Sequence, residues 1–451
     1  MKILMFESIS RGFRFEGMSA SLADADGRSK VGDHLEAPLK TLAILGLVLL
    51  CGVAANYARA SFSPLQEAIR VGLSLTDNQI ALVQGIAVAL PISLAAFPLS
   101  LVVDRGKRVR LLLTFAVINL LGTLLTAVST NFAMLFLARG LVGLGAFGTG
   151  MTIPSLISDL CTPATRGRAL SLSGIGYVIG RSIAFAAGGT LLGGKDGWQS
   201  VMLWLSVPLI AVVIVALLLR EPPRGEVMEA GAARQDRLVE FWRYRGTILP
   251  ILVGFVVVEM ADAAALIWAA PIFARNFSLS AAHVGSLMGM VLLCSGIAGM
   301  FAGGMLADFC QRRGGNRRAI FLMSCLALLS VPASCFALAP SPLLASVLLA
   351  LLIMVGSILA IMSSAVLVVA IPNELRGLSM GAAIFGNTVF CIALAPLLVS
   401  TIASVIGGPS PLAIALSAVC VSTSLVGAVV LLKGARSAQA LPTPQPAQRE
   451  T

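Results

Sequence analysis

Long stretches without a single charged side chain are the feature that most constrains this 451-residue chain. Val201–Leu219 and Leu343–Ile371 contain no Asp, Glu, Lys or Arg, and a helix of about 20 apolar residues crosses the hydrocarbon core of a bilayer. The chain is 57% hydrophobic and only 12% charged, whereas about a quarter of the residues of a soluble domain are charged. The alternation over about 10 residues that is typical of membrane β-barrel strands does not occur. We therefore predict an all-α membrane protein.

The apolar segments divide the chain into two halves. We predict a six-helix bundle at 41–219 and another at 247–432, joined by a charged cytoplasmic linker at 220–246. The polar segments 1–40 and 433–451 are expected to be disordered tails, with Met18 as an alternative start. The twelve predicted transmembrane helices are 41–69, 76–102, 109–128, 132–159, 166–193, 199–219, 247–273, 281–306, 318–338, 342–371, 377–404 and 411–432.

The basic residues are distributed unevenly between the two sides of the predicted membrane protein. The net charge is +11, and 26 of the 32 Lys and Arg residues fall in the tails and in every second loop. Only Arg70, Lys195 and Arg275 lie in the alternate loops. Loops rich in Lys and Arg stay in the cytoplasm. This distribution predicts a cell inner membrane protein with both termini cytoplasmic, and it argues against nucleic acid as the partner of the basic residues.

Similar motifs follow corresponding spans of the two halves, which indicates parallel repeats. The motif at Ser100–Arg105 follows the second span, and a similar one at Gly304–Asp308 follows the eighth. An Asp at a helix end can bind basic side chains and a neighbouring helix N-terminus, so these motifs predict a cytoplasmic latch between helices. The predicted latch residues are Asp104, Arg105, Arg108, Asp159, Asp308 and Arg312.

These motifs resemble the major facilitator superfamily of transporters. The loop Ser100…Asp104-Arg105-Gly106-Lys107-Arg108 resembles its signature cytoplasmic loop, and Arg139-Gly-Leu-Val-Gly143-Leu-Gly145 resembles its pattern in the fourth span. The resemblance implies the major facilitator fold, with two six-helix bundles around a central cavity, and transport by alternating access.

The finer pattern is most similar to the spinster-like branch and its anion-symporter relatives. It includes Asn56-Tyr57-Ala-Arg59 in the first span and Trp268-Ala-Ala-Pro271 in the seventh. This chain departs from those branches at two positions. It has no Asp beside Arg59, and Ala146 stands where Glu is common after the fourth-span glycines. The resemblance therefore does not supply proton-coupling acids in the first half.

Three arginines within spans of the first half predict a positive wall for the cavity. Arg suits carboxylate or phosphate recognition, because its guanidinium presents a fork of donors. A small organic anion or a zwitterionic amphiphile is the expected substrate. The alternatives are that the arginines are paired with acids and do not contact the substrate, and that Arg139 reaches the membrane interface. The predicted substrate-binding residues are Arg59, Arg139, Arg181, Tyr57 and Asn387.

Two acids in the seventh span are the candidates for proton coupling. Glu259 and Asp262 are three residues apart, so they share one face of a helix. Two neighbouring carboxylates raise each other's affinity for a proton. The alternative is a permanent structural pairing of one acid with Arg181 or Arg59. We predict a secondary transporter that is proton-coupled.

Other functions and partners can be weighed from the composition. With two histidines and eight cysteines that lack paired spacing, we expect neither a metal site nor a disulfide framework. No nucleotide-binding motif is found, so we expect no cofactor and no enzymatic activity. The expected partners are a small-molecule substrate and the lipid bilayer, with a monomer as the expected oligomeric state. Trp268 is expected to be an interfacial anchor, with an outer gate residue as the alternative.

Two other functions remain open at this stage. The first is a proton-driven exporter of hydrophobic or cationic drugs, in which the carboxylates would hold the substrate. The second is a polytopic membrane receptor that binds a ligand without transporting it.

Overall fold

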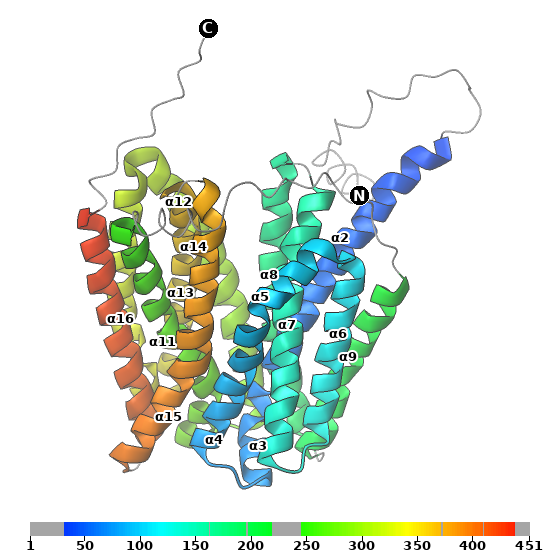
Figure 1. Cartoon of the computed structure of the whole chain (residues 1–451). Helices are drawn as coiled ribbons and strands as arrows, with labels where there is room; N and C mark the ends of the chain where they lie inside the picture. The colour runs from blue at the N-terminus through cyan, green and yellow to red at the C-terminus, as the bar shows by residue number, and fades with distance from the viewer. Residues whose placement is uncertain are drawn as a thin grey trace, which may run out of the picture.

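The computed structural model describes residues 31–161, 163–194, 197–218, 245–370, 373–408 and 410–437. These ranges form helices joined by short turns, and they contain no strand. Within them, 12 helices are long and apolar enough to cross a membrane. The prediction of an all-α membrane protein with twelve transmembrane helices is therefore confirmed (Figure 1).

The first half of the chain forms the helices α2 to α9, and the second half forms α11 to α16. The elements of the first half are α2 (Val31–Ala60), a 3-10 turn (Ser63–Leu65), α3 (Gln66–Gly72), α4 (Asp77–Ala81), the π-helix η2 (Leu82–Ile86), α5 (Ala87–Arg105), α6 (Arg108–Ala127), α7 (Phe132–Leu160), α8 (Pro163–Leu192) and α9 (Trp198–Leu218). The elements of the second half are α11 (Arg245–Phe277), α12 (Ala281–Ala333), a 3-10 turn (Phe336–Leu338), α13 (Pro342–Ala370), α14 (Asn373–Gly386), the π-helix η4 (Asn387–Leu394), α15 (Ala395–Ile406) and α16 (Pro411–Ser437).

Local sequence signals account for several helix ends. Thr76 and Gln79 form a reciprocal capping box at the start of α4, because each side chain bonds the backbone N–H of the other. Asn131 and Ser280 cap α7 and α12 by accepting from backbone N–H groups. Gly315 has a φ of 61° and bends α12 into two antiparallel spans, Ala281–Arg313 and Gly315–Leu338.

The described helices extend into both predicted tails. Helix α2 begins at Val31, within the segment 1–40, and α16 runs to Ser437, within the segment 433–451. Adding a residue to an existing helix is much easier than starting one, so helices can continue past the apolar part of a span. The rest of both tails and residues 220–244 of the predicted linker lie outside the described residues.

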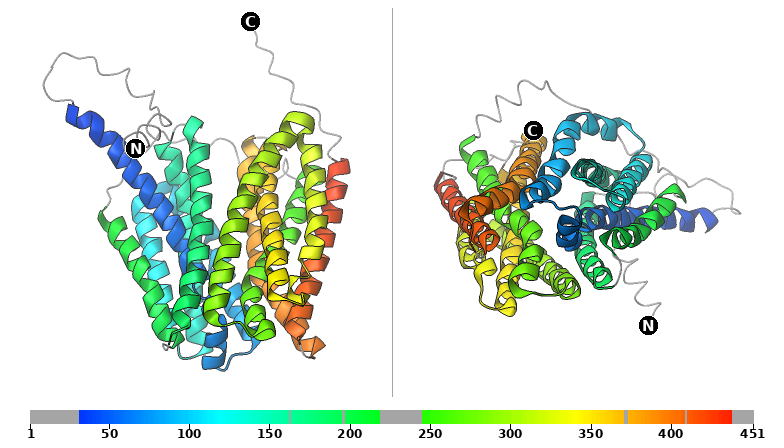
Figure 2. Two further views of the ribbon diagram at one scale, coloured as in Figure 1. Left: turned by 180° about the vertical axis from the view of Figure 1, so that it is seen from behind. Right: turned by 90° about the horizontal axis from the view of Figure 1, so that it is seen from below.

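The two halves lie side by side and meet mainly at one end (Figures 1 and 2). Helix α2 begins and α16 finishes at the same end of the molecule, which we name the terminus side, and the other end the opposite side. The ribbons of the halves diverge toward the terminus side in both side views. Small residues bring them together elsewhere. A Cβ on Gly189 of α8 would lie 2.5 Å from Gly285 of α12, and one on Gly85 of η2 would lie 2.9 Å from the Ile392 carbonyl oxygen of η4.

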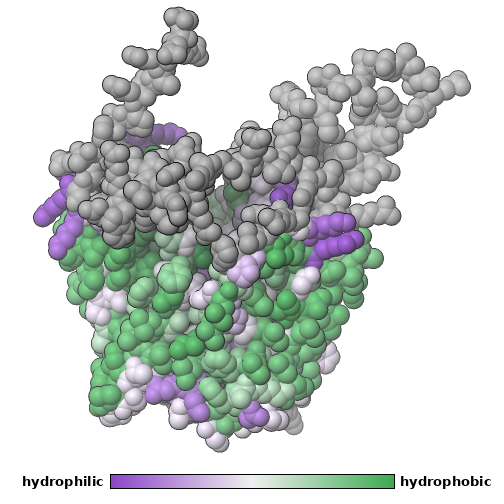
Figure 3. All heavy atoms as spheres, in the orientation of Figure 1, coloured by the Kyte–Doolittle hydropathy of each residue, from purple (hydrophilic) through white to green (hydrophobic). Residues whose placement is uncertain are grey.

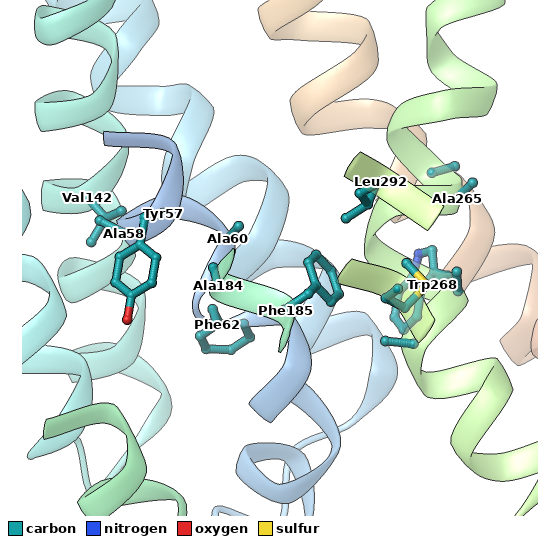
Figure 4. Close-up of a cluster of buried hydrophobic side chains, with 14 of the residues drawn as sticks. Tyr57, Ala58, Ala60, Phe62, Val142, Ala184, Phe185, Ala265, Trp268 and Leu292 are labelled. Carbon is teal, nitrogen blue, oxygen red and sulfur yellow. The ribbon is translucent and has the colours of Figure 1, made fainter. Parts of the chain in front are cut away.

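A hydrophobic core crosses the boundary between the halves. Phe62 and Phe185 from the first half belong to the same buried cluster as Trp268 and Leu292 from the second (Figure 4). Large apolar side chains also cover the outer surface, as the hydrophobic belt in Figure 3 illustrates, and such a surface suits a lipid environment. The expectation that Trp268 is an interfacial anchor is wrong. Its side chain is 0% exposed and its indole N–H donates to the Pro396 carbonyl oxygen at 3.1 Å, because α11 turns this face toward η4 and α15.

Candidate functional site

Four charged side chains from the middle of spans lie where the two halves face each other. Arg59 of α2 and Arg181 of α8 belong to the first half, and Glu259 and Asp262 of α11 belong to the second. All four are half-buried. Arg181 lies close enough to interact electrostatically with both carboxylates and with Arg59. Arg181 of the first half therefore lies near the acids of the second, with Arg59 next to Arg181, and we name these four residues the central charge cluster.

Helices α13, η4 and α16 pack against α11 around the acid pair of the central charge cluster. Asp262 packs against Gly356 of α13, where a Cβ would lie 3.3 Å from the carboxylate carbon and from Oδ1. The thiols of Cys391 and Cys420 donate to backbone carbonyl oxygens of α11 at 3.3 and 3.5 Å. These neighbours are small or only weakly polar. They leave the acid pair facing Arg181 as its charged neighbour.

Several polar atoms of the central charge cluster have no hydrogen-bond partner. These atoms are Arg181 Nε, Glu259 Oε1 and Asp262 Oδ1, and they are buried within the part of the chain that the structure describes. Buried polar atoms are normally hydrogen-bonded, and each exception calls for an explanation such as a ligand, an ion or water. The cluster thus offers both a donor and acceptors to a polar molecule or a proton.

Arg139 lies behind Arg59 rather than beside the acids. Its side chain is 2% exposed, and its Nη2 donates to the Arg59 carbonyl oxygen at 3.0 Å and to Gln84 Oε1 at 3.2 Å. Its guanidinium lies 4.9 Å from the centre of the Phe62 ring. The alternative in which Arg139 reaches the membrane interface is therefore wrong, because buried acceptors hold it inside the bundle.

The two uncharged candidates differ in exposure. Tyr57 is 5% exposed and lies in the buried cluster beside Val142 (Figure 4). Asn387 is half-buried at the first position of η4. Because π-helices are often found at functional sites, the position of Asn387 favours a role in substrate binding more than that of Tyr57 does. Contact of either residue with a substrate stays a prediction.

A second charged cluster joins the halves on the opposite side, and the sequence analysis missed it. Arg275 at the end of α11 donates to Glu67 Oε2 of α3 at 3.0 and 2.7 Å. It also donates to both carboxylate oxygens of Asp77 of α4, each at 2.8 Å. Arg70 lies 2.7 Å from Glu67 and 3.8 Å from Asp77. We name these four residues the Arg275 clamp. Arg70 and Arg275 are two of the three basic residues in the loops of that side, and this rarity was the available signal.

The predicted latch residues lie at the terminus side, and the structure brings two of them together. Arg108 of α6 forms an ion pair with Asp159 of α7. Asp308 and Arg312 are exposed, and no ion pair joins them to each other in the described part of the chain. The side chains of Asp104 and Arg105 lie outside the described residues.

Comparison with known proteins matches this architecture. The sequence pattern of the Major Facilitator Superfamily matches residues 48–261. The chain is 29% identical to protein spinster homolog 1 of Homo sapiens over 161 residues, so the alignment covers 32% of this chain and 29% of the human protein. It is 25% identical over 369 residues to an MFS-type efflux pump of Mycolicibacterium smegmatis, covering 79% of this chain and 84% of the pump.

Solved structures agree with the family match over most of the chain. A bacterial homologue of the human lysosomal transporter Spinster, in an inward-facing and unoccupied conformation, has a TM-score of 0.72 at 19% identity, covering 88% of this chain and 96% of that one. A nucleoside transporter has a TM-score of 0.70 at 13% identity, covering 88% of this chain and 99% of that one. At these identities the likeness concerns the fold. Sequence pattern and twelve-helix fold together show that the chain belongs to the major facilitator superfamily.

Proposed function

We propose that this transporter moves a small organic anion or a zwitterionic amphiphile across the cell inner membrane and couples this movement to protons. The observation that carries the proposal is the central charge cluster. Arg59 and Arg181 would bind the anionic group, and the acid pair Glu259 and Asp262 would carry the proton. Charged residues within spans are costly in lipid, and they mark substrate and ion pathways in transporters.

The nearness of Arg181 to both acids supports a particular sign for the proposed coupling. While Glu259 and Asp262 are ionised, their charges compete with an anion for Arg181. A proton on the pair removes this competition, so the anion binds more tightly. Linkage is reciprocal, so a bound anion raises the affinity of the pair for the proton by the same factor. Proton and anion would therefore bind together and cross in the same direction.

The Arg275 clamp and the latch residues would take part in alternating access. Most Lys and Arg residues lie at the terminus side or in the tails, so the positive-inside rule assigns that side to the cytoplasm. The Arg275 clamp would then close the outer side, and the likeness to an inward-facing structure supports this assignment. The pair Arg108 and Asp159, with Asp104, Arg105, Asp308 and Arg312, would rearrange when the cytoplasmic side closes. We propose a monomer as the functional unit.

One observation favours a second candidate function, the export of hydrophobic or cationic drugs. The relative with the long alignment is named an efflux pump, and the second half of this chain presents two carboxylates. In that case Glu259 and Asp262 would hold the drug, and the arginines would stabilise the fold. The human relative carries the name spinster, which supports the anion or amphiphile proposal over a shorter part of the chain.

Ligand-dependent thermal stability of the purified protein in detergent tests the proposal. The panel contains organic anions, lysophospholipids and cationic drugs, each at acidic and alkaline pH. We expect an anionic or zwitterionic compound to raise the melting temperature of wild type, more strongly at acidic pH, and not that of Arg181→Ala. Arg70→Ala is the matched control, because it also removes an arginine, but from the Arg275 clamp and not from the central charge cluster. Stabilisation by cations alone, lost in Glu259→Gln or Asp262→Asn, would favour the drug exporter.

A further inference from the structure

Arg139 carries a positive charge that is buried without a counter-ion. The side chain is 2% exposed, and within the described residues it forms no ion pair. Its hydrogen-bond acceptors are neutral, the Arg59 carbonyl oxygen and the Gln84 side-chain oxygen. A buried charge with neutral partners is costly. Its presence so close to the central charge cluster therefore needs an explanation.

The neutral acceptor Gln84 is itself held firmly by neighbouring polar groups. It is 5% exposed in the π-helix η2, and its Nε2 donates to Ser63 Oγ at 3.2 Å and to Gln66 Oε1 at 2.9 Å. These contacts orient the amide, so that its oxygen faces Arg139. Gln84 thereby connects the second span to the segment 61–65, where the helix of the first span is interrupted between α2 and α3.

Arg139 holds the chain where that interruption begins. Helix α2 ends at Ala60, one residue after Arg59, and the 3-10 turn starts at Ser63. The bond from Arg139 to the Arg59 carbonyl oxygen and the contact with the Phe62 ring lie on either side of the helix end. Because both contacts fix the backbone around the end of α2, they limit the positions that the Arg59 side chain can reach.

The charges of the three first-half arginines are connected in space. Arg139 interacts electrostatically with Arg59, and Arg59 interacts with Arg181. The effective dielectric constant is lower inside a protein than in water, so the buried charge of Arg139 contributes to the electrostatic potential at Arg59 and Arg181. An anion at Arg59 and Arg181 would be attracted by Arg139 without touching it.

We propose that Arg139 is a positioning residue, which holds Arg59 at the substrate site, and that Gln84 keeps the charge of Arg139 uncompensated. The affinity of the site for an anion then depends on two side chains that the anion does not contact. This inference rests on the proposed transport of an anion.

The substitution Gln84→Glu tests the proposal most directly. The new carboxylate keeps the shape of the side chain and its bond to Arg139, but it supplies a counter-ion. Gln66 Nε2 has no hydrogen-bond partner in the described part, so a rotated Gln66 amide can donate to the new carboxylate. We expect an unchanged or higher melting temperature without ligand, and anion binding weakened about tenfold, the order expected for neutralising one nearby charge.

Matched variants separate charge from positioning. Gln84→Met removes the acceptor without adding charge, so we expect a lower melting temperature and anion binding within about threefold of wild type. Arg139→Met removes charge and tether and should lose anion binding. Arg139→Lys keeps the charge and can donate one bond to the Arg59 carbonyl oxygen, so it should recover part of the affinity that Arg139→Met loses. Equal affinity in wild type and Gln84→Glu would overturn the proposal.

A second measurement does not need the substrate. With Arg59→Cys in a background that lacks the eight native cysteines, alkylation by anionic and by cationic methanethiosulfonate reagents reports the potential at the cavity wall. We expect Gln84→Glu to lower the ratio of the anionic to the cationic rate about tenfold and Gln84→Met to leave it unchanged. If no anion of the panel binds wild type, the proposed function fails, yet this ratio still decides the inference. An unchanged ratio in Gln84→Glu refutes it.

Discussion

The substitution Arg275→Ala should shift the transporter away from the conformation described here. Arg275 belongs to α11 of the second half, whereas its partners Glu67 and Asp77 belong to α3 and α4 of the first. These bonds can form only while the two halves meet on the opposite side. Their loss should therefore favour the conformation in which that side is open.

The size of the shift follows from the contacts. Arg275 donates four hydrogen bonds to two carboxylates at 2.7 to 3.0 Å, and its side chain is 28% exposed. Charge-assisted hydrogen bonds contribute about 1.5–3 kcal/mol when buried, and exposed ion pairs contribute about 0–1 kcal/mol. We take about 1 kcal/mol for each carboxylate, so about 2 kcal/mol in all, between these limits. This energy corresponds to a change of about 30-fold in the ratio of the two conformations.

Distances between spin labels in lipid nanodiscs can measure the shift. Val128 follows α6 of the first half, and Val405 lies near the end of α15 of the second half, both on the opposite side. They are 55% and 85% exposed, so labels there disturb little packing. If the open form is about 1% of wild type, it should rise to about a quarter of the molecules in Arg275→Ala.

Arg70→Ala is the control for this experiment. Arg70 contacts Glu67 within α3 and does not bridge the halves, so its loss should change the ratio only slightly. Arg275→Lys cannot reproduce the planar bidentate bonds and should give an intermediate shift. The reasoning is refuted if Arg275→Ala and wild type give the same distance distribution.

The remaining predictions concern coupling and stability. Glu259→Gln and Asp262→Asn should reduce the rise in anion uptake by proteoliposomes at acidic pH, because fewer carboxylates compete with the anion; an unchanged pH profile in both would exclude the pair. Gly180→Ala should lower the melting temperature, since α8 there touches the α2 backbone and overpacking costs about 1–3 kcal/mol. Trp268→Phe should destabilise by about 1–3 kcal/mol, because it removes the indole hydrogen bond to the Pro396 carbonyl oxygen and leaves a smaller side chain in a fully buried place; unchanged chemical denaturation would contradict this.

Much of the fold could be predicted because the position of a span depends on local hydropathy. The fourth span was predicted at 132–159 and is Phe132–Asp159, and the tenth was predicted at 342–371 and is Pro342–Leu367. The two π-helices were not predicted. An apolar sequence such as that of Leu82–Ile86 has the same hydropathy in an α-helix and in a π-helix. The two π-helices contact each other although they are about 300 residues apart in the chain. Such a long-range contact cannot be seen in the local sequence.

The sequence identified charged residues but not their partners. Arg139 was expected at the substrate, because an intramembrane Arg is costly unless it has a function. Its actual acceptors are a backbone carbonyl and Gln84, 55 residues away, and neither has a charge pattern that would reveal the pairing. Arg275 and Glu67 are separated by 208 residues, and only the folded chain brings α11 next to α3.

The two charged clusters both depart from the repeat symmetry of the chain, with opposite distributions of charge. Repeated motifs predict equivalent residues in both halves, yet the central charge cluster has its arginines in the first half and its acids in the second, and the Arg275 clamp has its acids in the first half. Arg70 pairs with Glu67 and Asp77 within the first half, but each remaining charge finds the opposite charges of its cluster only in the other half. When the halves separate on one side, the charges exposed there must be satisfied by water, a proton or a substrate. We infer that this asymmetry, which duplication does not provide, allows a proton and an anion to control which side is open.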